Sequence, residues 1–437
     1  MTNKCGRPLC RLLAATLLGL ATVQAGVAEV PVEPVGRVAV LDRAFDPHWL
    51  WAADASAARL VLLDLDDGRF LGQINTGWGM PQLLVGRVRP EIYVPETYFS
   101  RGTRGVRTDL ASVYDARTLA PVAEVLLPPK RAINPLPVGN TALSDDDRFL
   151  AVFNMTPATS LTLVDLQARQ ARGEIPTPGC SLVYAIGARR FAALCADGAL
   201  LVLEIDGSGQ LVRRVRTEPF FDPVSDPVME KAVRWGDRWV FVSFEGLVHA
   251  VDFSSPQPRF ASPWSLLGPE DREQGWRPGG TQPLAIHSAS GRLYVLVHQG
   301  GVDTHKEPGS EIWVYDLRER RRVKRIEAAN PGLTIMGSPV LLGTEWTNAF
   351  LLDHVAPTLG IEEIAVTQDD EPLLVTGASY TGSLCVHDAR TGALLRRLAT
   401  HNMTNQLLFA APRQGPVPAA SGSDPAGGGE ARRGRRR

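Results

Sequence analysis

Residues 147–165, DRFLAVFNMTPATSLTLVD, consist of two apolar runs that are separated by a short polar segment and closed by an acidic residue. The first run, Phe149-Leu150-Ala151-Val152, follows the turn-forming pair Asp147-Arg148, and the second run ends in Asp165. Short apolar runs bounded by turn residues are typical of β-strands. The stretch therefore predicts two neighbouring strands of an antiparallel sheet.

The same signature, an apolar strand that ends in an acidic residue, recurs along the chain. The acidic residues are Asp64, Asp115, Asp165, Glu204, Asp252, Asp316 and Asp388. Subtraction of these positions gives successive spacings of 51, 50, 39, 48, 64 and 72 residues. The first four spacings suit a four-stranded blade of roughly 40 to 50 residues. A carboxylate at a strand end accepts backbone N–H bonds, so these acids are expected to shape turns.

Seven copies of the signature predict an all-β chain, a seven-bladed β-propeller of four-stranded antiparallel blades over residues 29–412. An isolated meander has exposed edges, so the blades are expected to stack around a closed ring. The two longest spacings indicate loop insertions at 262–282 and 328–360, because neither stretch contains another strand with the acidic ending. The run Val38-Ala39-Val40-Leu41 is a candidate for the strand that closes the last blade.

The two ends of the chain differ in composition from the rest. Basic residues precede the apolar run 12–23, and small residues follow it, a pattern that predicts a signal peptide over residues 1–28. A single membrane-spanning helix is the competing interpretation, but the run falls short of the roughly 20 apolar residues that a bilayer requires. Residues 413–437, rich in Gly, Pro and Arg, are expected to form a disordered tail. The predicted location is the periplasm.

The charge of the chain argues against two classes of partner. The 46 Lys and Arg residues nearly balance the 47 Asp and Glu residues, and the basic residues are scattered apart from the tail. Nucleic acids and anionic membranes are bound through clustered basic residues. Neither is therefore predicted as a partner.

Two of the five cysteines lie within the predicted signal peptide and leave with it. Cys180 and Cys195 bracket the strand-like run Phe191-Ala192-Ala193-Leu194, and in an oxidising compartment such a pair is expected to form a disulfide. A zinc site is the alternative, although no Cys-x-x-Cys motif or paired histidines accompany the two cysteines. Cys385 lies in an apolar strand and is expected to be a buried free thiol.

Common catalytic motifs are absent from the sequence. It contains no His-Glu-x-x-His, no Gly-x-Ser-x-Gly, no Walker loop and no dinucleotide fingerprint. His298 and His305 flank a loop that also holds Asp303 and Lys306, and a solvated loop between strands is favoured over a metal site there. No catalytic, cofactor-binding or metal-binding residue is therefore assigned to this chain.

One basic segment has two interpretations. Arg101, Arg104 and Arg107 lie close together and precede Asp109. They either bind an anion or a partner surface, or they belong to a charged loop between strands.

Several stretches carry a family resemblance. They are 98–109 (YFSRGTRGVRTD) with Val113-Tyr114-Asp115, 275–282 (GWRPGGTQ), His305-Lys306 before 312–316 (IWVYD), 366–374 (VTQDDEPLL) and 387–392 (HDARTG). In these stretches the chain resembles the heavy subunit of the quinoprotein amine dehydrogenases, of the methylamine and aromatic amine type. The likeness runs from about residue 36 to 400.

The resemblance implies a partner and a reaction. Heavy subunits of this family pair with a small, disulfide-rich subunit in an α2β2 heterotetramer. The small subunit carries tryptophan tryptophylquinone and the catalytic aspartate, which explains the missing site in this chain. The enzymes oxidise a primary amine to an aldehyde and ammonia and pass the electrons to a blue copper protein of the amicyanin or azurin type. The spacing of Cys180 and Cys195 also matches the heavy-chain disulfide of the family.

The resemblance further implies a residue that shapes the substrate channel. The family places an aromatic residue at the channel mouth, in a Gly-aromatic stretch after the first blade signature, and Gly77-Trp78 falls there. Trp78 is therefore predicted to narrow the channel and to favour short amines, the alternative being that it packs in an inter-blade loop. A competing hypothesis for the whole chain is a stand-alone propeller that serves as a binding or assembly module without a quinone subunit.

Overall fold

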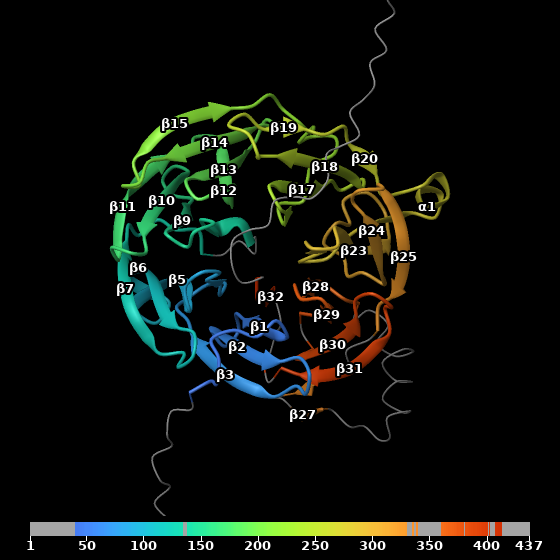
Figure 1. The fold of residues 1–437 in the computed structure, drawn as a ribbon, viewed down its shortest axis with the longest axis horizontal. Helices are drawn as coiled ribbons and strands as arrows, with labels where there is room; N and C mark the ends of the chain where they lie inside the picture. Colours follow the sequence, from blue (N-terminus) through green and yellow to red (C-terminus); the bar gives the residue numbers. More distant parts are fainter. Residues whose placement is uncertain are drawn as a thin grey trace, which may run out of the picture. The chain divides into compact units, whose positions relative to one another are not determined.

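The apolar runs pair with their neighbours in chain order and form seven antiparallel blades in the computed structural model (Figure 1). The structure describes residues 40–133, 138–329, 334–335, 338–339, 360–379, 381–400, 402 and 407–412. Within these residues the blades follow one another around a ring, which confirms the predicted seven-bladed β-propeller. The expected signal peptide and tail, and most of the 328–360 insertion, lie outside the described residues.

Blades 1 to 4 each contain four strands, which follow one another from the ring centre outwards. Blade 1 consists of β32 (Leu407–Ala410), β1 (Trp49–Asp54), β2 (Arg59–Asp64) and β3 (Phe70–Asn75). Blade 2 consists of β4 (Leu84–Val85), β5 (Glu91–Arg101), β6 (Arg104–Asp115) and β7 (Pro121–Leu127). Blade 3 consists of β8 (Thr141–Leu143), β9 (Phe149–Asn154), β10 (Ser160–Asp165) and β11 (Gln170–Pro176). Blade 4 consists of β12 (Cys180–Ala185), β13 (Arg190–Cys195), β14 (Leu200–Ile205) and β15 (Leu211–Arg216).

Blades 5 and 6 each carry an additional short strand, whereas blade 7 has four strands. Blade 5 consists of β16 (Val233–Trp235), β17 (Arg238–Val242), β18 (Leu247–Asp252), β19 (Arg259–Phe260) and β20 (Trp264–Ser265). Blade 6 consists of β21 (Trp276–Pro278), β22 (Leu284–His287), β23 (Arg292–Gln299), β24 (Glu311–Asp316) and β25 (Arg321–Glu327). Blade 7 consists of β28 (Glu363–Val366), β29 (Leu373–Gly377), β30 (Ser383–Asp388) and β31 (Leu394–Ala399). The remaining elements are η1 (Val138–Asn140), α1 (Pro269–Glu273), β26 (Thr334–Ile335) and β27 (Ser338–Pro339).

The position of a strand in its blade explains its sequence. Middle strands such as β9 are covered on both faces by the neighbouring blades, and every residue of β9 is buried. A strand that is covered on both faces needs a continuous apolar run, which is what the sequence contains. The outermost strands, such as β15 with the sequence LVRRVR, are mostly exposed and carry charges. The blades therefore stack through their middle strands and present their outer strands to solvent.

The acidic residues of the repeat signature all lie at or near the end of the third strand of a blade. Six are aspartates whose side chains accept backbone N–H bonds from the following turn, as Asp115 does from Arg117 and Thr118 at 3.0 and 2.8 Å. The bond from the Thr118 backbone holds the pKa of Asp115 below its ordinary value. This geometry confirms the predicted turn-forming role for the six aspartates.

Two details of the fold differ from the sequence-based expectation. The ring is closed by β32 from the C-terminal part, which pairs with β1, whereas Val40 and Leu41 lie outside any strand. The assignment of 38–41 as the strand that closes the last blade was therefore wrong, because blade 7 is complete with β28 to β31 and the ring closes in blade 1 through β32. Val38 and Ala39 lie outside the described residues. The 262–282 stretch contains β20 and the short helix α1. No helix in the described part of the chain is long and apolar enough to cross a membrane.

The strand directions define two edges of the ring. Because neighbouring strands are antiparallel, turns between the first and second and between the third and fourth strands lie together; this edge holds the signature acids and is called the acidic edge. Hairpins between the second and third strands, and the connections between blades, lie at the opposite edge. This opposite edge contains the tip of the β5–β6 hairpin and is called the hairpin edge.

Candidate functional site

The β5–β6 hairpin is longer than the other hairpins of the ring. β5 and β6 have 11 and 12 residues, whereas β1 and β2 have six each. Pairing continues to Arg101 and Arg104, which lie opposite each other at the tip. Gly102 adopts a φ of +69° in the turn, a conformation that favours glycine. Residues 100–106 are all exposed, so the hairpin tip forms an accessible basic surface at the hairpin edge.

The three arginines of the predicted contact surface have different environments. Arg101 and Arg104 are exposed at the tip, beside Val106, which is 72 % exposed. Arg107 instead pairs with the Asp109 carboxylate through Nε and Nη2, both at 2.8 Å, and donates to the Arg131 carbonyl at 2.7 Å. The structure thus brings Arg101 and Arg104 together and engages Arg107 within the chain.

Asp109 is the centre of a buried polar network at the base of the hairpin. Its side chain is fully buried and also accepts hydrogen bonds from the Thr97 hydroxyl at 2.8 Å and the Arg131 backbone N–H at 3.0 Å. The Arg131 guanidinium, 4 % exposed as a residue, donates from Nε to the Thr97 hydroxyl at 2.8 Å. Burial lowers the pKa of Arg131 to about 10, and the Asp109 charge opposes that shift. The network ties β5, β6 and the segment after β7 into one unit.

Trp78 lies in the connection between β3 and β4, at the same edge as the hairpin tip. Its backbone N–H donates to the Thr97 carbonyl at 2.6 Å, and its residue is 47 % exposed. At Gly77 a Cβ atom would stand 2.3 Å from the Thr97 carbonyl oxygen, so only glycine allows this approach. The backbone of the Gly77-Trp78 pair is therefore fixed against β5, while the indole stays half exposed.

Glu96 also binds the Gly77-Trp78 loop, through the backbone N–H of Gly77. Its carboxylate, 1 % exposed as a residue, accepts the Gly77 backbone N–H at 2.9 Å and the hydroxyls of Tyr98 and Tyr114 at 2.7 and 3.2 Å. Burial and the Glu96 carboxylate raise the pKa of both tyrosines. Both hydroxyls remain protonated donors at neutral pH, so Glu96 keeps three hydrogen-bond donors and orients the Trp78 segment.

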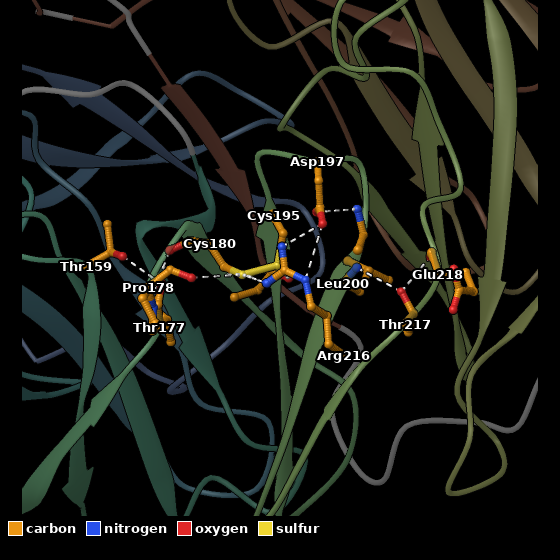
Figure 2. The surroundings of a disulfide bond; sticks show 12 residues. Thr159, Thr177, Pro178, Cys180, Cys195, Asp197, Leu200, Arg216, Thr217 and Glu218 are labelled. Carbon is orange, nitrogen blue, oxygen red and sulfur yellow. Dashed lines mark hydrogen bonds and ion pairs between the residues drawn. A yellow bond between two sulfur atoms is a disulfide. The ribbon is translucent and has the colours of Figure 1, made fainter.

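The predicted disulfide is present in the structure. Cys180 at the start of β12 and Cys195 at the end of β13 lie opposite each other, and their sulfur atoms are bonded (Figure 2). Arg216 lies over the bond, donating to the Cys180 sulfur at 3.3 Å and pairing with Asp197 at 2.8 Å. The bond joins the first two strands of blade 4 at the hairpin edge. Cys385 is a buried free thiol, as expected.

The two histidines near the β23–β24 loop occupy separate environments. His298 is buried in β23 and contacts the Thr304 hydroxyl at 2.9 Å through Nε2. The ring of His305 stacks on Phe244 with centroids 3.6 Å apart. Among the residues that the structure describes, no group of three or more His, Cys, Asp or Glu side chains could hold a metal ion.

Several residues of this site were missed at the sequence level. Glu96 and Thr97 interrupt the apolar run of β5, and polar residues inside a buried strand are a signal of internal hydrogen bonding. Arg131 carries no comparable signal, because it lies in an irregular segment 22 residues from its partner Asp109.

Comparison with known proteins agrees with this architecture. The family model described as methylamine dehydrogenase heavy chain matches residues 38–336. The methylamine dehydrogenase heavy chain of Paracoccus versutus is 27 % identical over 376 residues, covering 85 % of this chain and 78 % of that protein. The heavy chain of Methylorubrum extorquens is 25 % identical over 394 residues, covering 87 % of each.

One solved structure shows the fold alone. A protein of unknown function from Desulfotomaculum acetoxidans superposes with a TM-score of 0.56 at 13 % identity, covering 83 % of this chain and 98 % of that one. The family match spans more than half of the sequence and includes the hairpin, the Gly77-Trp78 loop and the disulfide. The chain therefore belongs to the methylamine dehydrogenase heavy chain family.

Proposed function

We propose that this chain is the non-catalytic heavy subunit of a periplasmic primary-amine dehydrogenase. In this proposal it docks a small subunit that carries tryptophan tryptophylquinone, in an α2β2 heterotetramer. The enzyme converts a primary amine to an aldehyde and ammonia, and a blue copper protein of the amicyanin or azurin type accepts the electrons. The match of residues 38–336 to the heavy chain family is the observation that carries the proposal.

The hairpin edge supplies the docking surface in this proposal. The tip holds two adjacent cations, Arg101 and Arg104, next to the exposed apolar side chain of Val106. Arginine beside apolar surface is a composition favoured at protein interfaces. The Asp109 network anchors the base of the hairpin, so the tip is presented on a rigid support.

Trp78 supplies the channel constriction in this proposal. Its backbone is held by Thr97 and Glu96, and its half-exposed indole lies at the same edge as the hairpin. A large planar ring at a channel mouth excludes long substrates by steric contact. The quinone of the small subunit would act as the electron sink, and this chain would contribute docking and substrate selection.

The first experiment is co-expression of the chain in a periplasm with its genomic neighbours, followed by purification through a tag on this chain. We expect a small cysteine-rich subunit to co-elute, with visible quinone absorbance that bleaches on addition of methylamine. A colourless propeller that elutes alone in every preparation would contradict the proposal and favour the stand-alone binding module.

The docking surface is tested by charge reversal of the hairpin tip. The double variant Arg101→Glu/Arg104→Glu is expected to lower the yield of co-eluting small subunit at least about tenfold, because like charges meet at the interface. Arg69→Glu, an exposed arginine at the acidic edge, is the matched control and should leave the yield unchanged. Equal yields for both variants would remove the hairpin tip from the interface.

The channel role of Trp78 is tested with substrates of different length. Trp78→Ala is expected to raise kcat/KM for longer amines relative to methylamine, because the constriction is removed. Trp78→Phe retains a ring and should preserve most of the preference for short amines. Unchanged relative rates in Trp78→Ala would show that the indole only packs in the inter-blade loop.

A further inference from the structure

A cavity at the centre of the ring has no role in the function proposed above. It has a volume of about 320 Å³ and is lined by residues of the innermost strands of blades 1 to 5 or of segments next to them. Most of the wall is apolar, with Leu83, Val85, Val183 and Leu408 among the lining residues. A volume of a few hundred Å³ with apolar walls and few polar groups is typical of small-molecule sites.

The polar groups of this cavity are concentrated at its two ends. At the acidic edge, Arg87 follows β4 and Arg234 lies in β16, and both line the cavity. At the hairpin edge, Glu230 and Lys231 precede β16 and pair with each other at 2.5 Å. At the hairpin edge, a lysine and a glutamate that pair with each other both line the cavity, whereas at the acidic edge the charged side chains that line it are the two arginines.

Arg87 and Arg234 share a single carboxylate. Arg234 binds both oxygens of Asp145, at 2.5 and 2.9 Å, and its Nε donates to the Gly236 carbonyl at 2.9 Å. Arg87 reaches the same carboxylate through one longer hydrogen bond of 3.4 Å. In the part of the chain that the structure describes, this is the only hydrogen bond of the Arg87 side chain. Asp145 is thus mainly engaged by Arg234, and most N–H donors of Arg87 remain available.

The two guanidinium groups are close enough to repel each other. Burial, and then the positive charge of Arg234, lower the pKa of Arg87. The side chain of Arg234 is 10 % exposed and that of Arg87 is 26 % exposed, so little water screens the pair. Asp147 lies behind the Arg87 turn, accepts the backbone N–H groups of residues 87–89, and does not line the cavity.

We infer that this central cavity binds a small organic anion, a carboxylate with an apolar body, through the guanidinium groups of Arg87 and Arg234. The planar N–H fork of arginine matches the geometry of a carboxylate. Arg87 and Arg234 line the cavity, whereas the nearby carboxylates of Asp145 and Asp147 do not. The apolar wall takes the body of the ligand. A guanidinium has N–H donors and no acceptor, so the two arginines offer no hydrogen bond to a protonated primary amine, and this site differs in ligand preference from an amine channel.

The test compares two probes of similar size and different charge on the full chain, purified with whatever subunits co-elute. Isothermal titration calorimetry with benzoate is expected to show saturable one-site binding. Benzyl alcohol, a neutral analogue of similar size, is expected to bind at least about tenfold more weakly, because the charged hydrogen bonds to arginine are lost. Equal binding of the two probes would overturn the inference. So would the absence of benzoate binding at a probe concentration of about 10 mM, which corresponds to a very weak affinity.

A pair of variants locates the site. Arg87→Gln should weaken benzoate at least about tenfold and leave benzyl alcohol unchanged, because only the charged contact is removed. Arg89→Gln removes the same charge from the same turn, but Arg89 does not line the cavity, so its benzoate affinity should match that of the unaltered chain. If both variants weaken benzoate binding equally, the loss of affinity reflects the net charge of the protein rather than a contact in the cavity. The assignment of the benzoate site to the cavity then fails. Because the comparison of benzoate with benzyl alcohol uses the unaltered chain, the inference stays testable should Arg87→Gln fail to fold.

Discussion

The aspartate turns of the acidic edge and the Asp109 network of the hairpin edge use the same functional group in opposite ways. Asp388 accepts the backbone N–H groups of Arg390 and Thr391, both at 2.8 Å, within three residues of itself. Asp109 is fully buried and binds Arg107, Thr97 and the backbone of Arg131, which reaches it from another segment.

The difference shows which features of a repeat are local. A turn carboxylate is satisfied by its own neighbours, so it recurs wherever the turn recurs. A buried carboxylate between arginines works only where several segments meet, and its removal leaves cations without a partner in a dry environment. The comparison therefore predicts small, similar costs at the acidic edge and large, individual costs at the hairpin edge.

The largest effect is expected for Asp109→Ala. The variant leaves Arg107 and the buried Arg131 without their carboxylate, which should lower the free energy of unfolding by roughly 3–5 kcal/mol. Urea unfolding followed by fluorescence measures the change, with Asp388→Ala as the matched control from the acidic edge. If Asp109→Ala lowered the free energy of unfolding no more than the control does, the predicted difference between the two edges would be wrong.

The second-largest effect on stability is expected for removal of the disulfide at the hairpin edge. The double variant Cys180→Ala/Cys195→Ala opens a loop with a sequence separation of 15 residues. Cross-links of this length stabilise folded chains by about 3 kcal/mol, largely by restricting the unfolded chain. Urea unfolding of the double variant under oxidising conditions measures the loss. Cys385→Ala removes a buried thiol without opening a loop; if it cost as much as the double variant, packing rather than the cross-link would account for the effect.

A smaller cost is expected for Asp388→Ala itself. It removes two backbone-capping bonds in one turn, comparable to the loss of a helix cap, at about 0.5–2 kcal/mol. The bond from the Thr391 backbone lowers the pKa of Asp388. A carboxylate with a lowered folded-state pKa stabilises the fold above its unfolded value of about 3.9 and loses that contribution as the pH falls through the folded pKa. The difference in unfolding free energy between the unaltered chain and Asp388→Ala should therefore shrink as the pH falls below about 4, which is roughly the unfolded pKa of an aspartate. A difference that stays constant between about pH 7 and about pH 3 would contradict the turn role.

The smallest effect on stability is expected for Arg104→Ala. The side chain is exposed at the hairpin tip, and surface substitutions usually change stability by less than about 0.5 kcal/mol. Arg107→Ala in the same hairpin should cost clearly more, because it removes two hydrogen bonds to the buried Asp109. Equal unfolding midpoints for the two variants would show that hairpin position, rather than burial of the partner, sets the cost.

The sequence by itself determined the number of blades, the turn role of the acidic residues and the pairing of Cys180 with Cys195. Each of these depends on features close together along the chain: apolar runs, the turn that follows them, and two neighbouring strands. The family resemblance was readable at the same level, because its motifs are continuous segments.

Only the tertiary structure decided which strand closes the ring, which residues surround Asp109 and which side chains meet at the centre. β32 is more than 350 residues from β1, its partner, and Arg87, Asp145 and Arg234 belong to three different blades. Residues that are distant in sequence meet because the ring closes, and no local periodicity records which of them become neighbours. The sequence thus specifies the blades, whereas their packing around one axis specifies the cavity and the buried charges.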